Sequence, residues 1–478
     1  MKWRTWLAAP IALALGGCDF APRYAPPAVA TPSNFKDEPA GGGTLPVSGE
    51  WWLAFNDRTL NVLQAQVDAA NPDLAAAVAA NDEAVARANA ALSNAYPQVN
   101  AVPHFLASKQ SANRPLRGAN EPNFYGDNLL GVQVAYEIDI WGRVRDIVNS
   151  ANATAEASAD ALADARLELH AELARDYVNL RGYDAEAKLF ADTIVIYRSA
   201  LKLTQDRLAA NIASPVDVDR AQTQLSSAEA LASDLALSRA LLENSIAALV
   251  GKAAPSLRIA LSSAPLAMPR PPRAVPADVL RNRPDIAESE RQTAAASELI
   301  GSARANFFPK LTLLALGGTQ DTNFRLFNPE NLFGSIGPTI DIPLFDAGLR
   351  QAELRIAKAE FTQAAENYRA TVLRALQEVQ DQLSSLRWLA DESRQTTTAA
   401  VAARKAADLS LTLYRDGASS FLDVVTAQSA ALEAEGLAIV LHTRQQVAVI
   451  GLMLALGGGW TVPPEPPAKP GFAPYLAE

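Results

Sequence analysis

Residues 128–145 read NLLGVQVAYEIDIWGRVR, and this stretch decides how the chain folds. From Leu130 to Ile140 every second side chain is apolar, and the positions between them are small, polar or acidic. A period of two residues predicts a β-strand with one apolar and one polar face. From Gly142 onward the chain is rich in Ala and Leu and almost free of Gly and Pro, which predicts a long helix. The stretch therefore predicts a strand that runs directly into a long helix.

The same arrangement occurs again later in the chain. Residues 331–350 read NLFGSIGPTIDIPLFDAGLR and share with the first copy an NLxG start, an IDI triplet and a following Gly and Arg. Two further segments also correspond. PVDVDRAQTQL at 215–225 aligns with FLDVVTAQSAAL at 421–432. This duplication predicts two structural repeats, residues 51–250 and 277–460.

The N-terminus has the features of a bacterial secretion signal. Lys2 and Arg4 precede a short apolar run that ends in Gly16-Gly17-Cys18. The run is too short for a spanning helix, so we predict that residues 1–17 are a signal peptide. Small residues before a cysteine resemble a lipobox, which predicts a covalent lipid such as palmitate on Cys18. The alternative is an ordinary signal peptide with an incidental cysteine.

Composition and motifs exclude several functional classes. The net charge of −10, without a basic cluster among aromatics, argues against nucleic-acid binding. The single cysteine excludes an intrachain disulfide, and the widely separated His104, His170 and His442 have no metal-ligand spacing. The sequence contains no nucleophile elbow or phosphate loop, so we expect no enzyme activity, no cofactor and no metal. After the signal, no apolar run reaches the ~18 residues of a spanning helix, so any membrane crossing would use strands.

The other segments are predicted from their periodicity and from their Pro and Gly residues. Three Pro-rich segments are expected: an extended tether at 18–50, a linker at 251–276 and a C-terminal tail at 461–478. Strands are predicted at about 97–107 and 129–141 in the first repeat and at about 310–319 and 332–344 in the second. Long helices are predicted at 142–209, 216–250, 349–414 and 421–456. A continuous helix over the first of these ranges would be ~100 Å long.

Four strands cannot close a barrel, and an open sheet edge is not tolerated in lipid. The strands therefore need partners from other chains, and three copies would give a 12-stranded barrel. The predicted fold class is an α+β membrane channel, in which a trimeric barrel of four strands per chain continues as a long α-helical barrel in the periplasm. The polar strand faces would line the lumen with Gln133, Glu137, Asp139, Thr339 and Asp341. Trp141 and Gly142 would mark the seam where the barrel becomes the tunnel.

Six short segments together resemble a known family. They are Cys18 followed by Pro22-Arg23-Tyr24, Trp51-Trp52 with Phe55 and Asp57, YEIDIWGRVR (136–145), NRPDIAESE (282–290), IGSARANFFPKLTL (300–313) and IDIPLFDAGLR (340–350). In this combination the chain resembles the outer-membrane factors, the TolC-like trimeric channel-tunnels of tripartite efflux pumps, and within them the lipoprotein branch. The resemblance covers essentially the whole mature chain. Asp19 departs from it, because in some enteric bacteria an aspartate there resembles an inner-membrane retention signal.

The resemblance implies a passive efflux duct in the outer membrane of a Gram-negative bacterium. It implies a lipid-anchored homotrimer that takes drugs or other small toxic compounds from an inner-membrane RND-type pump and a periplasmic adaptor. Three alternatives stay open: the duct of a type I protein secretion system, a non-channel periplasmic scaffold lipoprotein and a lipid-anchored enzyme. The sequence does not identify the exported compound.

The resemblance also implies a gate where the long helices turn at their periplasmic tips. Matching tip to tip places Asp423 at a pore-lining acid of the family and Asp217 at a gate-bonding acid. Nearby gate candidates are Asp219, Arg220, Tyr414, Arg415 and Asp416. Gly417 and Ala213-Ser214 resemble the adaptor-docking grooves. The alternative is that these are ordinary surface charges of the tips.

Overall fold

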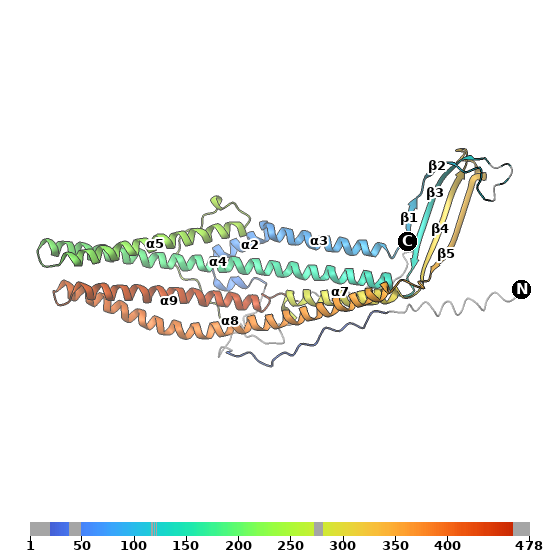
Figure 1. The fold of residues 1–478 in the computed structure, drawn as a ribbon. Helices are drawn as coiled ribbons and strands as arrows, with labels where there is room; N and C mark the ends of the chain where they lie inside the picture. The colour runs from blue at the N-terminus through green and yellow to red at the C-terminus, as the bar shows by residue number, and fades with distance from the viewer. Residues whose placement is uncertain are drawn as a thin grey trace. The chain divides into compact units, whose positions relative to one another are not determined.

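The structure is a computed structural model that describes residues 20–37, 49–115, 118, 120, 122–271 and 281–461. The predicted signal peptide, Cys18, Asp19 and nearly all of the predicted tail lie outside the described residues. The chain divides into two compact units. The first comprises residues 1–28, 80–159 and 288–369, and the second comprises residues 29–79, 160–287 and 370–478. Figure 1 shows the order of the elements.

The compact units do not coincide with the two sequence repeats. Each repeat contributes its strands to the first unit and most of its long helices to the second. The physical reason is that the strands of both repeats pair in one sheet, and the helical hairpins of both repeats pack in one core. The repeats are therefore units of sequence, and neither forms a compact body by itself.

The first unit contains one antiparallel sheet. Its strands are β1 (Gln98–Ala101), β2 (His104–Lys109), β3 (Phe124–Ile138), β4 (Lys310–Asp321) and β5 (Leu332–Asp341), in the order β1-β3-β4-β5, with β2 also paired to β3. The predicted strand at 97–107 is thus broken at Val102-Pro103, because proline has no N–H to donate to a neighbouring strand. The register is unchanged across the break, since Ala101 pairs with Val132 and His104 with Leu129. The sheet therefore has four strand positions.

The register decides which side chains share a face of the sheet. Glu137 lies opposite Thr312, which lies opposite Thr339, and Asp341 lies opposite Lys310. Because alternate residues share a face, Gln133, Glu137, Thr339 and Asp341 all lie on one polar face, as predicted. Asp139 lies beyond the end of β3 and lines the same cavity as Glu137 and Asp341. Its carboxylate also accepts a hydrogen bond of 2.8 Å from the backbone N–H of Arg145, so it caps the following helix.

The shared glycine of the duplicated stretch has a structural cause. Gly142 has a φ of +80° and Gly348 a φ of +90°, and each immediately precedes the first residue of a long helix. These left-handed values strain any residue with a Cβ, so glycine is favoured where strand changes to helix. Beside Gly142, the indole N–H of Trp141 donates to the carbonyl of Pro309 at 2.8 Å, which joins the connection from β3 to α4 to the residue that precedes β4.

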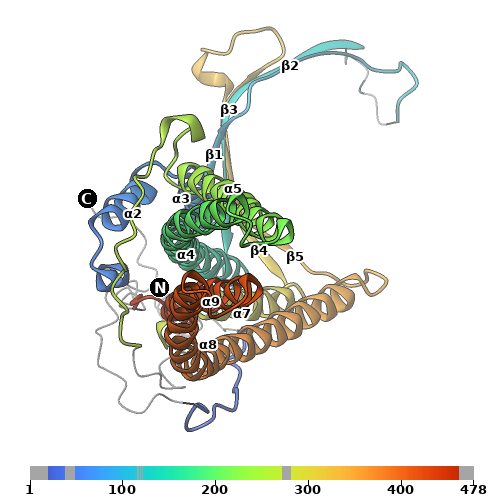
Figure 2. The same cartoon turned by 90° about the vertical axis from the view of Figure 1, so that its left-hand side faces the viewer.

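Two helical hairpins dominate the chain. They are α4 (Arg143–Ala209) with α5 (Pro215–Leu249), and α8 (Leu349–Arg415) with α9 (Phe421–Ala455), and each end lies within one residue of the expected position. Figures 1 and 2 show the helices of each hairpin side by side. By length and composition α9 also passes the test for a membrane-spanning helix, which the sequence analysis did not expect. Its Ile450, Leu452 and Met453 are buried in the second unit.

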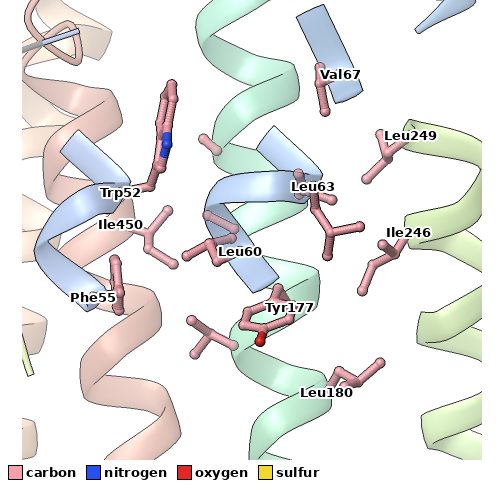
Figure 3. Close-up of a cluster of buried hydrophobic side chains, with 14 of the residues drawn as sticks. Trp52, Phe55, Leu60, Leu63, Val67, Tyr177, Leu180, Ile246, Leu249 and Ile450 are labelled. Atoms are coloured by element: carbon pink, nitrogen blue, oxygen red, sulfur yellow. The ribbon is translucent and has the colours of Figure 1, made fainter. Parts of the chain in front are cut away.

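Shorter elements complete both units. These are η1 (Trp51–Phe55), α2 (Arg58–Ala70), α3 (Pro72–Ser93), η2 (Ala254–Ser256), α7 (Pro284–Ala305) and η3 (Pro329–Asn331). The paired tryptophans of the sequence begin the core of the second unit. Trp51, Trp52 and Phe55 are buried with Tyr177 of α4 and Ile450 of α9, as Figure 3 shows for part of the cluster. Burying such aromatic side chains stabilises a fold by roughly 1.5–3 kcal/mol each.

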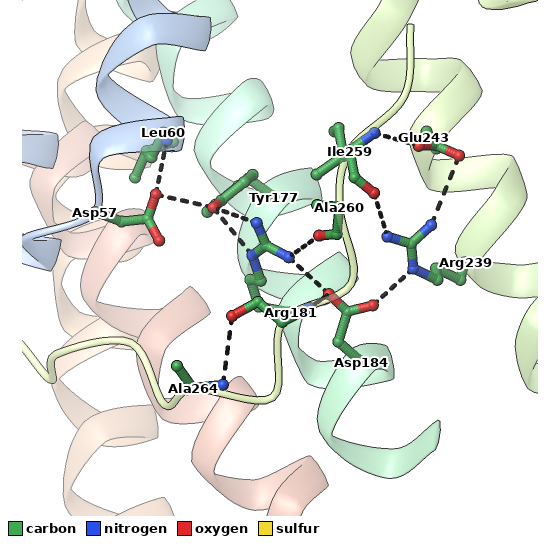
Figure 4. Close-up of polar contacts among 11 residues, drawn as sticks. Asp57, Leu60, Tyr177, Arg181, Asp184, Arg239, Glu243, Ile259, Ala260 and Ala264 are labelled. Atoms are coloured by element: carbon green, nitrogen blue, oxygen red, sulfur yellow. Dashed lines mark hydrogen bonds and ion pairs between the residues drawn. The ribbon is translucent and has the colours of Figure 1, made fainter. Parts of the chain in front are cut away.

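The described part of the predicted linker is held against the helices of the second unit. Arg181 of α4 donates to the carbonyl of Ala260 at 2.8 Å, and Arg239 of α5 donates to that of Ile259 at 2.8 Å. The buried carboxylate of Asp184 accepts from both arginines, at 2.7 and 2.6 Å. Figure 4 shows this network. The segment after α5 is therefore tied to α4 and α5 by hydrogen bonds from ion-paired arginines, although its composition predicted only a linker.

The NRPD segment ties three helices together in the second unit. Arg283 makes two hydrogen bonds to Asp285 at the start of α7, of 2.9 and 2.7 Å. It also donates to Glu378 of α8 at 2.8 Å and to the carbonyl of Ala455 at the end of α9 at 3.0 Å. The guanidinium has several donors in a fixed geometry, so one buried arginine serves three helices. This gives Arg283 and Asp285 of that motif a structural role.

Candidate functional site

The two helical tips are built alike. Both α5 and α9 begin with a capping box, in which a serine precedes the helix and an aspartate is its third residue. The backbone N–H of Ser214 donates to Asp217 at 3.4 Å, and that of Ser420 donates to Asp423 at 3.0 Å. Such boxes satisfy backbone donors at a helix start and place a negative charge at its positive end. The duplication in the sequence therefore extends to the local structure of the tips.

The two predicted gate acids thus have a structural role in this chain. Asp217 accepts from its cap and also lies 3.7 Å from the guanidinium of Arg220 in the next turn. Asp423 accepts from both the N–H and the hydroxyl of Ser420, the latter at 2.8 Å. Both carboxylates accept their hydrogen bonds within their own tips.

The side chain that joins the two tips is Arg207, which is not among the gate residues that the sequence predicts. It lies in the last turn of α4 and donates to the carbonyl of Tyr414 at 2.8 Å and to that of Arg415 at 3.3 Å. These carbonyls end α8, where a positive charge is favourable. Its guanidinium also lies 4.7 Å from the centre of the Tyr414 ring. Arg207 is therefore a clasp of hydrogen bonds and a cation–π contact between the two hairpins of one chain.

Tyr414 is the predicted tip residue that the structure places inside. It is 4% exposed and packs in a cluster with Tyr197, Phe421 and Val424, its ring centre 5.2 Å from that of Phe421. Burial raises the pKa of the Tyr414 hydroxyl, and the positive charge of Arg207 opposes this shift. An apolar cluster thus lies directly under the clasp and is shared by α4, α5, α8 and α9.

The other predicted gate residues lie on the surface of the tips. Asp219, Arg220, Arg415 and Asp416 are exposed. Asp219 and Arg220 line an open groove of about 710 Å³ formed by α4, α5 and α9. Neither Gly417 nor Ala213-Ser214, the residues expected in a docking groove, lines it. The structure therefore brings Tyr414 and the backbone of Arg415 to the clasp and leaves the other candidates around it.

A second charged cluster lies on the polar face of the sheet, within the first unit. Glu137 pairs with Arg143 at 2.7 Å and with Lys310 at 2.9 Å. These residues line a cavity of about 270 Å³ together with Asp341 and Arg350. The cluster joins the end of β3 and the start of β4 to the start of α4. Among the residues that the structure describes, no group of His, Cys, Asp and Glu has the arrangement of a metal site.

Comparisons with known proteins give one consistent result. A family model described as outer membrane efflux protein matches residues 63–252 and 275–458. The toluene efflux pump outer membrane protein TtgC of Pseudomonas putida is 29% identical over 456 residues, which cover 94% of each chain. The cation efflux system protein CusC of Escherichia coli is 27% identical over 465 residues, covering 94% of this chain and 97% of that protein. The solved outer-membrane channel OprN superposes with a TM-score of 0.87 at 27% identity, covering 93% of this chain and 100% of OprN.

Proposed function

The chain belongs to the outer membrane efflux protein family, and on this basis we propose that it is the outer-membrane channel of a tripartite efflux pump. It takes small toxic compounds from an inner-membrane RND-type pump and a periplasmic adaptor and conducts them passively to the outside. The named relatives are a toluene and a cation efflux protein, so the family admits unlike cargoes. Selection of the compound is therefore assigned to the pump, and the channel carries out no chemical step.

The observation that carries this proposal is the sheet of the first unit. One of its faces is polar, and the other exposes large apolar side chains such as Leu332, Ile336 and Ile340. Within the described chain, β5 pairs only with β4, and β1 and β2 pair only with β3. Backbone groups of an open edge cannot remain unpaired in lipid. Three chains would close the edges as a homotrimeric barrel of 12 strands, with the polar faces toward the lumen and the helices in the periplasm.

We place the gate of this channel at the helical tips. The clasp of Arg207, the cluster under Tyr414 and the two capped tips support a closed state in which the hairpins of each chain are held together. Asp423 and Asp217 are proposed to contribute negative charge at the constriction, which favours cations. Arg415, Asp416, Asp219 and Arg220 are the other tip charges in reach of cargo or adaptor.

A pair of neighbouring substitutions tests the channel. Ile336 is 76% exposed in the middle of β5, and Ser335 lies next to it on the opposite face. Lysine on the lipid face near the middle of a bilayer costs about 2–4 kcal/mol. We expect Ile336→Lys to abolish heat-modifiable trimers in the outer-membrane fraction and Ser335→Lys to retain both trimers and conductance in planar bilayers. Equal insertion of the two variants would contradict the barrel, and a wild-type protein without conductance would contradict the channel.

A covalent lipid on Cys18 is the second part of the proposal. A single acyl chain binds a membrane only marginally, so the lipid would assist the barrel and not replace it. In cells fed with labelled palmitate, the wild-type chain is expected to carry label and Cys18→Ser to carry none. Label that persists on the variant, or its absence from the wild-type chain, counts against lipidation.

A further inference from the structure

The first described residue, Phe20, is seated in an aromatic cluster of the first unit. Its ring is stacked on that of Phe308, with centroids 4.6 Å apart and planes at 11°. Phe308 is in turn 4.8 Å from the Trp141 ring, and Phe20 is 6.2 Å from it. Trp141 follows β3 and Phe308 precedes β4, so Phe20 completes a cluster that both repeats supply.

Backbone contacts hold the same segment along α7. Arg304 donates to the carbonyl of Phe20 at 2.8 Å, and the hydroxyl of Tyr24 donates to the carbonyl of Glu290 at 3.2 Å. Between them, Gly301 leaves room for the chain, because a Cβ there would collide with the backbone of Ala21 and with the carboxylate of Asp146. The two aromatic rings and Arg304 thus receive the ring and the carbonyl of Phe20, and Gly301 receives the backbone of Ala21.

We infer that Trp141, Phe308, Gly301 and Arg304 form a docking site for the chain's own N-terminal segment, and that this site positions the lipid anchor. The inference rests on the proposed lipidation of Cys18. Two residues of extended chain span at most ~7 Å, so docking of Phe20 keeps Cys18 close to the place where strand changes to helix. A lipid on a freely moving tether would add affinity for the membrane but would enter it at no fixed place relative to the proposed barrel. A docked tether fixes that place.

Trypsin cleavage after Arg23 measures the docking directly. Arg23 is exposed but lies between docked residues, and cleavage of a native protein tracks the population of the locally open form. Purified, palmitate-labelled trimers in detergent would be digested, and the new N-terminus at Tyr24 followed by mass spectrometry. We expect Phe20→Ala, which removes the ring, and Gly301→Ala, which obstructs the path of the chain, each to speed this cleavage roughly tenfold or more.

Two control variants make the result specific. Phe20→Trp keeps an aromatic ring and is expected to retain the protection. Gly436→Ala adds the same methyl group to a helix glycine that has nothing within 4 Å, and it is expected to leave the cleavage rate unchanged. If the Phe20→Ala and Gly301→Ala chains carry the label and are cleaved at the wild-type rate, the docking site is refuted. A wild-type chain without label would instead refute the lipidation, and with it any role of this site in placing a lipid.

Discussion

Replacing Arg207 by alanine is expected to raise the single-channel conductance of the protein in planar lipid bilayers. Arg207 donates the hydrogen bonds of 2.8 and 3.3 Å that join the last turn of α4 to the carbonyls that end α8. Removing a hydrogen bond to a charged group costs about 1.5–3 kcal/mol, and the half-buried position of Arg207 favours the lower end of this range. Since about 1.4 kcal/mol is a factor of ten in an equilibrium, the open fraction is expected to increase roughly tenfold.

The control for this experiment lies on the same helix. Arg198 of α4 pairs with Glu229 of α5 at 2.9 Å, within one hairpin, so Arg198→Ala removes a similar charge without releasing α8. Conductance and antibiotic leakage should stay at the wild-type level in that variant. If Arg207→Ala forms stable trimers that conduct no more than the wild type, the clasp is not the element that holds the channel closed. Replacing Asp217 or Asp423 by alanine is a less specific test of the gate, because it also removes a helix cap worth about 0.5–2 kcal/mol.

Asp184→Ala is expected to prevent the second unit from folding stably. The Asp184 side chain is 1% exposed and accepts from Arg181 and Arg239, and its loss leaves two largely buried guanidinium groups without their shared counter-ion. Breaking a buried ion pair by removing one partner costs about 3–5 kcal/mol. Folded domains are stable by only about 5–15 kcal/mol, so this is a large fraction of the total. Yield of trimers and their midpoint of thermal unfolding would measure the effect.

Asp192→Ala is the matched comparison. Asp192 lies on the same helix and pairs with Lys188, but its side chain is 57% exposed. Exposed pairs of this kind contribute about 0–1 kcal/mol. The two substitutions have equal helix propensity and remove the same charge, so they differ in burial and in the partners that are lost. Similar unfolding midpoints for both variants would show that the network around Arg181 is not needed for the stability of this unit.

The sequence by itself determined the strand faces, the duplication and the helix ends. Alternation from Leu130 to Ile140 fixed which side chains share a face, because a strand has a period of two whatever it packs against. Glycines at 142 and 348 marked the change from strand to helix, because their left-handed φ is a local property of the backbone. Ser214 and Ser420 likewise begin helices through contacts within three residues. Signals of this kind are complete within a short window of sequence.

Only the tertiary structure decided which side chains meet across the chain. In the sequence, Arg207 is only a positive charge in the last turn of a helix. The structure places it beside the end of α8, 207 residues away. Phe20 reads as part of a Pro-rich tether until Phe308 and Trp141 receive its ring. Asp139 continues the alternation of the strand, yet the N–H of Arg145 draws it into a helix cap. Periodicity reports the face on which a residue lies. The partner that a residue meets on that face is set by packing and register between distant segments. No local sequence pattern contains that information.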